Sequence, residues 1–270
     1  MHIPHSAFLE LYQTEDIRLE AKSVFSAVYY MHPANLTELC AKAGIGRYAA
    51  VNSCRLLVER GWMRLVRTKG KGTAVRPICW VPKEHQEKMA QQLKTEYDLA
   101  PLAGEFLLGK LVELWIDAPG CVSNARPGFL VNPATKERLE LDRYIPGLIA
   151  FEHNGLQHYV TTEMYADDEA LAQRRARDLI KAALCAQMEI PLVTVTAQDL
   201  DVRQFRDRLP ATLLLHYVDL NEPYATSLDR LCSAYRKKAQ ASKAQGRQAH
   251  SGGVRKEGSR SGNEAPTGSQ

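Results

Sequence analysis

The chain has 270 residues, which is long enough for two domains of ordinary size with separate cores. Its 45% hydrophobic and 24% charged residues are typical of soluble globular proteins, and no apolar run approaches the roughly 18 residues of a membrane span. The first residues, MHIPHSAFLELYQTED, lack the basic start and the apolar core of a signal peptide. We therefore expect a globular, cytoplasmic protein that has no membrane partner.

The net charge of +4 conceals a strong segregation along the chain. Residues 18–88 contain 13 Lys and Arg against 5 Asp and Glu, a net charge of +8. Residues 89–232 contain 14 against 21, a net charge of −7, and residues 233–270 contain 8 against 2, a net charge of +6. A basic front and a basic tail favour a polyanionic partner, and an acidic middle favours carboxylates that bind a cation. The alternative is that these charges are ordinary solvated faces.

The six cysteines lie at least 14 residues apart. They form no C-x-x-C pair, and no histidine lies beside them at the spacing of a zinc site. We expect reduced thiols, most of them buried, and no structural zinc.

Residues 18–82, which follow an N-terminal extension of residues 1–17, predict three helices and then two strands. The first helix, within residues 20–31, has apolar residues at helical spacing. Asn35 is the predicted cap of the helix LTELCAKA, with Glu38 as its capping-box partner and Gly44 at its end. The next helix, RYAAVNSCRLLVERG, follows after Ile45-Gly46. Two helices joined by a short connection that contains glycine are typical of a helix-turn-helix.

A strand, a loop of glycine and lysine, and a second strand follow in WMRLVRTKGKGTAVRPICWV. The whole segment resembles winged-helix domains, in which the second helix of the motif enters the major groove and the wing grips the DNA backbone or the minor groove. The resemblance implies DNA contacts from the helix and from the wing, namely Arg47, Tyr48, Asn52, Arg55, Arg67, Lys69, Lys71 and Arg76. Winged helices also serve as protein-docking modules, and that alternative stays open.

The elements of the middle and end of the chain are predicted from periodicity and composition. Residues 83–99 are polar and favour a helical connector, and a strongly apolar helix begins at Leu102. Residues 168–188 form an amphipathic pattern, PLVTVT is typical of a short buried strand, and residues 202–232 suggest further helix on the core. The core domain is thus expected at residues 100–232. Because its end is rich in Gly and Ser, the basic tail of residues 233–270 is predicted to be disordered.

Two carboxylates are expected to meet at a hairpin in RLELDRYIPGLIAFEHNGLQHY, residues 138–159. Residues 138–144 alternate apolar and polar side chains, Pro146-Gly147 is a turn dipeptide, and an apolar run then leads to Glu152. Residues two apart in a strand share a face, so Glu152 and Asn154 point the same way. A partner strand that ends near Asp142 completes a group of oxygen atoms suited to a hard divalent cation.

These residues resemble the motif of the PD-(D/E)xK nuclease superfamily, whose fold is called restriction-endonuclease-like. Asp142 and Glu152 match its acidic residues, and Glu105 matches the acidic residue of the preceding helix. The likeness continues through EHNGLQHY, RDLIK, the cysteine of ALCAQM and the strand PLVTV, as in phage and bacterial members distantly akin to very-short-patch repair nucleases. It covers about residues 100–200. Asn154 stands where the motif has lysine, so Gln157 or Lys181 is expected to replace that lysine.

The resemblance implies an α/β protein in which a mixed β-sheet flanked by helices follows the winged-helix domain. It implies an endodeoxyribonuclease that depends on Mg²⁺ or Mn²⁺, with Asp142, Glu152 and the carbonyl of His153 as metal ligands. The expected catalytic residues are Glu105, Asp142, Glu152, Gln157 and Lys181. DNA is the expected partner, and a second copy of the chain or recombination proteins stay open as further partners. The alternative is an inactive DNA-binding regulator, or an accessory protein of recombination or transposition, with a nuclease-like fold.

Overall fold

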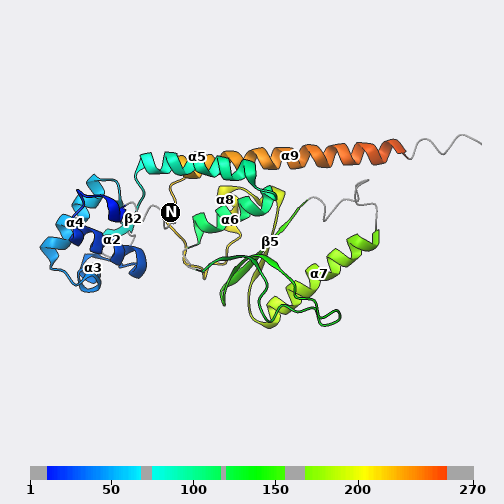
Figure 1. The fold of residues 1–270 in the computed structure, drawn as a ribbon, viewed down its shortest axis with the longest axis horizontal. Coiled ribbons are helices and arrows are strands. Elements are labelled where there is room, and N and C mark those ends of the chain that lie inside the picture. The colour runs from blue at the N-terminus through cyan, green and yellow to red at the C-terminus, as the bar shows by residue number, and fades with distance from the viewer. Residues whose placement is uncertain (1–10, 68–74, 117–119, 156–167, 254–270) are drawn as a thin grey trace, which may run out of the picture.

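The computed structural model describes residues 11–67, 75–116, 120–155 and 168–253. Within them the chain is a mixed α/β protein whose strands form two sheets (Figure 1). The helices and strands of residues 18–82 lie at one end of the molecule, and a four-stranded sheet with its helices forms the rest. In the part of the chain that the structure describes, no helix is both long and apolar enough to cross a membrane.

The front segment, residues 18–82, has the expected order of elements: α2 (Leu19–Met31), α3 (Leu36–Ala43), α4 (Arg47–Glu59), β1 (Met63–Arg67) and β2 (Val75–Cys79). The Asn35 side chain caps α3 by accepting from the Glu38 N–H at 3.0 Å, as predicted. Glu38 reaches back one residue further than a capping box requires and accepts from the Ala34 N–H. Gly44 ends α3 at φ 65°, a conformation that glycine adopts without strain. β1 and β2 pair as an antiparallel ribbon.

A pair of helices connects the front segment to the rest of the molecule. The predicted connector is α5 (Lys83–Leu99), and it packs along α9 (Pro223–Gly253), so that the two lie side by side in Figure 1. Buried apolar residues of the front segment and of the sheet region belong to one continuous cluster. The domain boundaries expected from the sequence stay a prediction.

The tail differs from its prediction. Disorder was expected from residue 233, whereas α9 continues to Gly253, so the prediction was wrong for residues 233–253. Two interactions explain the difference. Arg236 of α9 pairs with Asp201 at 2.7 Å and donates to the Leu200 carbonyl at 2.7 Å, which anchors the helix on the core. Beyond that point Ala, Gln, Lys and Arg dominate the sequence, and these are strong helix formers. Residues 254–270 lie outside the described residues.

The larger sheet has the order β3 (Val122–Ala125), β4 (Leu141–Ile145), β5 (Ile149–Asn154) and β6 (Leu192–Thr196). The first three strands are antiparallel neighbours, and β5 pairs with β6 in parallel, so the sheet is mixed as expected. The predicted hairpin forms between β4 and β5, with Gly147 at φ 70° in its turn. The strand β3 was not predicted, because its short sequence VSNA is polar and mostly exposed.

Helices cover both faces of this sheet (Figure 1). On one face, α6 (Ala103–Trp115), α8 (Val202–Asp207) and α9 pack over buried side chains that include Phe151 and Val195. On the other, α7 (Asp168–Gln187) packs over Ala150 and Leu192. Residues 202–232 were expected to add further helix to the core, and α8 and the first part of α9 do so; between the two helices the chain runs as turns and extended segments. The six cysteines, which all lie in the described residues, are free thiols; three are buried and three are half-buried.

Candidate active site

Asp142 and Glu152 lie at facing positions of the neighbouring strands β4 and β5. The register that pairs Arg143 with Phe151 places them one step further along the hairpin. The backbone pairing of β4 and β5 stops before these two residues. The Asp142 side chain supplies the next hydrogen bond between the strands, because its Oδ2 accepts the N–H of His153 at 2.6 Å. The side chains of both acids are thus held together where the two strands separate.

Lys181 joins this pair from α7, the helix that covers this face of the sheet. Its Nζ donates to both carboxylate oxygens of Glu152, at 2.9 and 3.0 Å. The two side chains are largely shielded from solvent, with exposed fractions of 15% for Lys181 and 11% for Glu152. Cys185, one helical turn later, is fully buried against the sheet and fixes the orientation of the helix. The sequence named Lys181 as a candidate for the missing lysine, and the structure brings it onto the acidic residue of the motif.

Glu105 approaches from the opposite side, in the first turn of α6. Two glycines of α6 make this approach close. A Cβ added at Gly104 would overlap the imidazole of His153, and one added at Gly109 would overlap the guanidinium of Arg143. Arg143 also donates to the Glu105 carbonyl at 3.5 Å. The two glycines and Arg143 were not predicted from the sequence. The spacing of two glycines within an apolar helix, GEFLLG, was the signal that such close packing leaves.

We call the carboxylates of Glu105, Asp142 and Glu152 the carboxylate cluster, in which the charge of Asp142 acts on both glutamates. Burial, followed by the negative charge of Asp142, raises the pKa of Glu152 to about 7, although Lys181 acts in the opposite direction. Burial also raises the pKa of Asp142 above its ordinary value, against the His153 N–H and the charges of Lys181 and Arg143. Burial and the charge of Asp142 raise the pKa of Glu105. Desolvation therefore outweighs the two cations, and the cluster as a whole favours a further positive charge.

This excess of negative charge fits a hard divalent cation. Among the described residues, no three His, Cys, Asp or Glu side chains lie close enough to hold a metal by themselves. Mg²⁺ does not require three, since it is commonly held by one or two carboxylates together with water. A backbone carbonyl can contribute as well. Because the N–H and the C=O of one strand residue point to the same neighbouring strand, the carbonyl of His153 faces the edge at which its N–H meets Asp142.

The remaining predicted site residues divide between those that the structure describes and those that it does not. Asn154 ends β5 and shares the face of Glu152, as its spacing predicted. Gln157 lies outside the described residues, and so do Lys69 and Lys71. Arg67 ends β1, but its side chain is also outside them.

The outward face of α4 carries the predicted helix contacts. Arg47, Tyr48 and Arg55 are exposed, Tyr48 to 82%, and Asn52 is half-buried beside them. Neither arginine forms an ion pair with any residue that the structure describes. Arg76 is half-buried on β2 and lines a cavity between the front segment and the sheet region, and its DNA contact stays a prediction.

Comparisons with known proteins add little to this geometry. No protein family matches the chain, and no solved structure matches it. A curated protein described as uncharacterized protein 033L, from Invertebrate iridescent virus 3, is 36% identical over 73 residues. The matched segment is 26% of this chain and spans 38% of the viral protein. The likeness to a viral protein of undescribed function assigns no activity.

Proposed function

We propose that the chain is a metal-dependent DNA endonuclease whose front segment binds DNA. One observation carries the proposal: Asp142 and Glu152 lie on the neighbouring strands β4 and β5, where Lys181 holds Glu152 by both oxygens and Glu105 adds a third, half-buried carboxylate. The mixed sheet between helices is compatible with the restriction-endonuclease-like fold that the resemblance implies.

Each residue of the site has a role in phosphodiester hydrolysis on this proposal. Asp142 and Glu152, with the carbonyl of His153, hold Mg²⁺ or Mn²⁺. When bound, such an ion lowers the pKa of a coordinated water and offsets the charge that develops on the phosphate. Lys181 keeps Glu152 oriented and presents a cation beside the reacting phosphate, which is the task of the lysine that Asn154 replaces. Glu105 hydrogen-bonds a water of the site from the other side.

The front segment supports the DNA part of the proposal. Its order of three helices and an antiparallel ribbon is compatible with a winged helix. Arg47, Tyr48 and Arg55 form an exposed face on the helix that such domains insert into the major groove. Arginine side chains bind phosphates and base edges, and the amide of Asn52 on the same helix is suited to a base edge. The net charge of +8 on residues 18–88 adds long-range attraction to a polyanion.

The second candidate function is a DNA-binding regulator or recombination accessory that has lost nuclease activity. Asn154 in place of the motif lysine favours it. The position of Lys181 weighs against it, because a site without function has no reason to keep a lysine bound to the acidic residue of the motif.

The deciding experiment is incubation of the purified chain with plasmid, single-stranded and branched DNA in Mg²⁺, in Mn²⁺ and in EDTA. We expect cleavage in at least one metal and none in EDTA. Glu152→Gln should remove cleavage, while the matched control Glu84→Gln, an exposed glutamate of α5, should cleave as the wild type does. Calorimetric titration with Mn²⁺ gives a second measurement that needs no substrate. Identical metal binding by the wild type and by Glu152→Gln would refute the nuclease and leave the regulator.

A further inference from the structure

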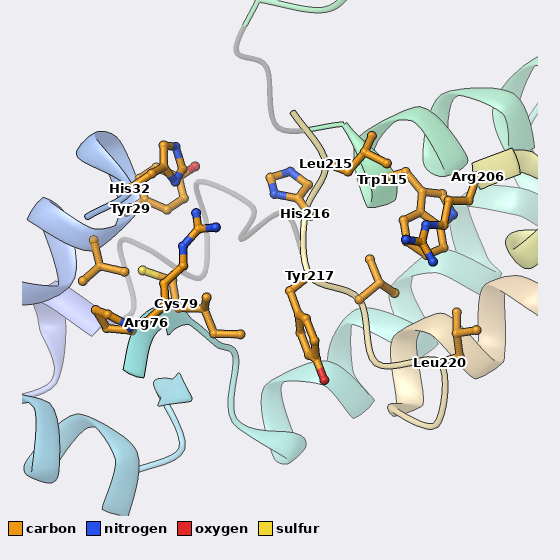
Figure 2. Close-up of a pocket in the computed structure, with 14 residues that line it drawn as sticks. Tyr29, His32, Arg76, Cys79, Trp115, Arg206, Leu215, His216, Tyr217 and Leu220 are labelled. Atoms are coloured by element: carbon orange, nitrogen blue, oxygen red, sulfur yellow. The ribbon is translucent and has the colours of Figure 1, made fainter. Parts of the chain in front are cut away.

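A cavity lies at the junction of the front segment and the sheet region, apart from the carboxylate cluster (Figure 2). It has a volume of about 440 Å³, which is within the range of small-molecule sites. Its walls come from α2, from β2, from the ends of α6 and α8, and from residues 215–220 of the chain between α8 and α9. We call it the junction cavity.

The walls of the junction cavity are cationic and aromatic. Arg76 and Arg206 line it together with His32, His216, Tyr29 and Tyr217, and no Asp or Glu is among the described residues that do so. In Figure 2 the guanidinium of Arg76 extends toward the space between His32 and His216. Imidazole and phenol groups can donate hydrogen bonds to an anion, and arginine donates in a planar fork.

The side chain of Arg76 is half-buried, and its Nε atom lacks an acceptor among the described residues. Its Nε is inaccessible to solvent and has no hydrogen-bond partner in the part of the chain that the structure describes. An unsatisfied buried donor is unfavourable and uncommon. Glu38 is the carboxylate whose pKa the charge of Arg76 helps to lower, but Glu38 is already bound by Lys42 at 2.6 Å and by the Ala34 N–H. Among the described residues Arg76 Nε is therefore left without an acceptor, and an anion that enters the cavity would supply one.

The acidic residues nearest to the cavity wall in sequence are used elsewhere. Asp219 lies between two residues of the wall, yet its carboxylate pairs with Arg64 at 3.0 Å, and Glu222 pairs with the same arginine. Arg64 stacks on the Trp80 ring, with 3.8 Å from its guanidinium carbon to the ring centre. These contacts join the front segment to the rest of the chain beside the cavity, and they engage Asp219 and Glu222 with Arg64 and not with Arg76.

We propose that the junction cavity binds a nucleoside phosphate, with its phosphate on Arg76 and its planar base against the aromatic wall. Arginine is the side chain best suited to bind a phosphate through two parallel hydrogen bonds, and tyrosine offers a flat apolar face to a base. The same chemistry is present in a free nucleotide and at the phosphorylated end of a nucleic acid strand. Because the ligand contacts both parts of the molecule, its binding also strengthens their attachment to each other.

The test is calorimetric titration of the full chain with AMP, adenosine and inorganic phosphate. AMP should bind more tightly than either of the others, because it alone offers both groups. Arg76→Gln should weaken AMP binding about tenfold or more, as expected when charge-assisted hydrogen bonds are removed. Arg203→Gln is the matched control, since Arg203 is exposed on α8 and does not line the cavity; it should bind AMP as the wild type does.

Three further measurements test the interpretation. Bound AMP should raise the thermal unfolding midpoint of the wild type but not that of Arg76→Gln, and the midpoints without ligand report whether the variant folds. Arg76→Lys, which retains the charge, should bind with intermediate affinity. A single-stranded oligonucleotide with a 5′-phosphate that competes with AMP identifies a strand end as the source, and binding of AMP without such competition identifies a free nucleotide. Absence of AMP binding at millimolar concentration, or equal binding by the wild type and Arg76→Gln, overturns the proposal.

Discussion

The carboxylate cluster and the outward face of α4 hold ionisable groups in opposite surroundings. Asp142, Glu152 and Glu105 are desolvated, lie near one another, and have pKa values raised above their ordinary range. Arg47 and Arg55 are exposed to solvent. Charges in a buried group interact strongly and respond to protons and metals, whereas exposed charges are screened by salt and act nearly independently. Mutations in the two regions should therefore differ in size, in additivity and in their dependence on solution conditions.

The largest effect is expected from removing one acid of the carboxylate cluster. Asp142→Ala and Glu152→Ala should each abolish DNA cleavage, a reduction beyond the roughly 10²–10³-fold typical of a single preorganised contact, because both residues would hold the metal in the proposed nuclease. DNA binding should persist, since the front segment is untouched. Cleavage assays with Mg²⁺ and gel-shift assays in EDTA measure the two properties separately. If either variant cleaves DNA at the rate of the wild type, the residue that it lacks is not a metal ligand of the nuclease.

Lys181→Ala should reduce turnover by a factor on the order of 10²–10³, and it should leave metal affinity almost unchanged at a pH high enough to keep Glu152 ionised in both proteins. Gln157→Ala should have an effect of similar size if the two residues share the task of the missing lysine. Because the charge of Lys181 lowers the pKa of Glu152, its removal should also move the acidic limb of the pH–rate profile to higher pH. Lys181→Arg, which retains the charge, is the matched control and should preserve the position of that limb. Unchanged turnover in Lys181→Ala would exclude the lysine from the reaction.

The carboxylate cluster should also make metal binding and stability depend on pH. A proton competes with the metal for Glu152, so Mn²⁺ affinity should fall about tenfold per pH unit below about 7. In EDTA the folded protein retains a proton that the unfolded chain has released between pH 4.5, the ordinary pKa, and about 7. The free energy of unfolding should therefore decrease as pH rises through that window, by about 1–3 kcal/mol.

Urea unfolding in EDTA at several pH values measures this slope. Glu152→Gln should flatten it, because the glutamine does not titrate, and Glu84→Gln should leave it as in the wild type. A slope that Glu152→Gln does not alter would show that other groups cause the pH dependence.

The smallest effects are expected on the face of α4. Arg47→Gln and Arg55→Gln should each weaken binding to duplex DNA by a few-fold. Each should also make the slope of log K against log salt concentration shallower, by about one unit for each phosphate that the variant no longer neutralises. Because both side chains are exposed, the double variant should show the sum of the two free-energy changes. Filter binding at several salt concentrations provides the data. If the substitutions weaken DNA binding by the same factor at low and at high salt, the arginines do not contact phosphates, and the face is better explained as a protein-docking surface.

The sequence by itself determined the elements whose causes are local. The Asn35 cap of α3, the Gly147 turn and the alternation that puts Glu152 and Asn154 on one face depend on residues only a few positions apart. The hairpin then brought Asp142 beside Glu152 without further information. Local hydrogen bonds and short periodicities can be recognised from the sequence alone, so these predictions needed no knowledge of packing.

The tertiary structure decided the features that depend on contacts between distant parts of the chain. Lys181 reaches Glu152 because α7 packs on that face of the sheet, and Glu105 enters the cluster because Gly104 lets α6 approach His153. Arg76 lines the junction cavity because the front segment and the sheet region meet beside it, and α9 continues past residue 233 because Arg236 anchors it to the core. Each of these outcomes depends on which surfaces bury each other. That choice follows from the energetics of the whole fold, and no local pattern encodes it.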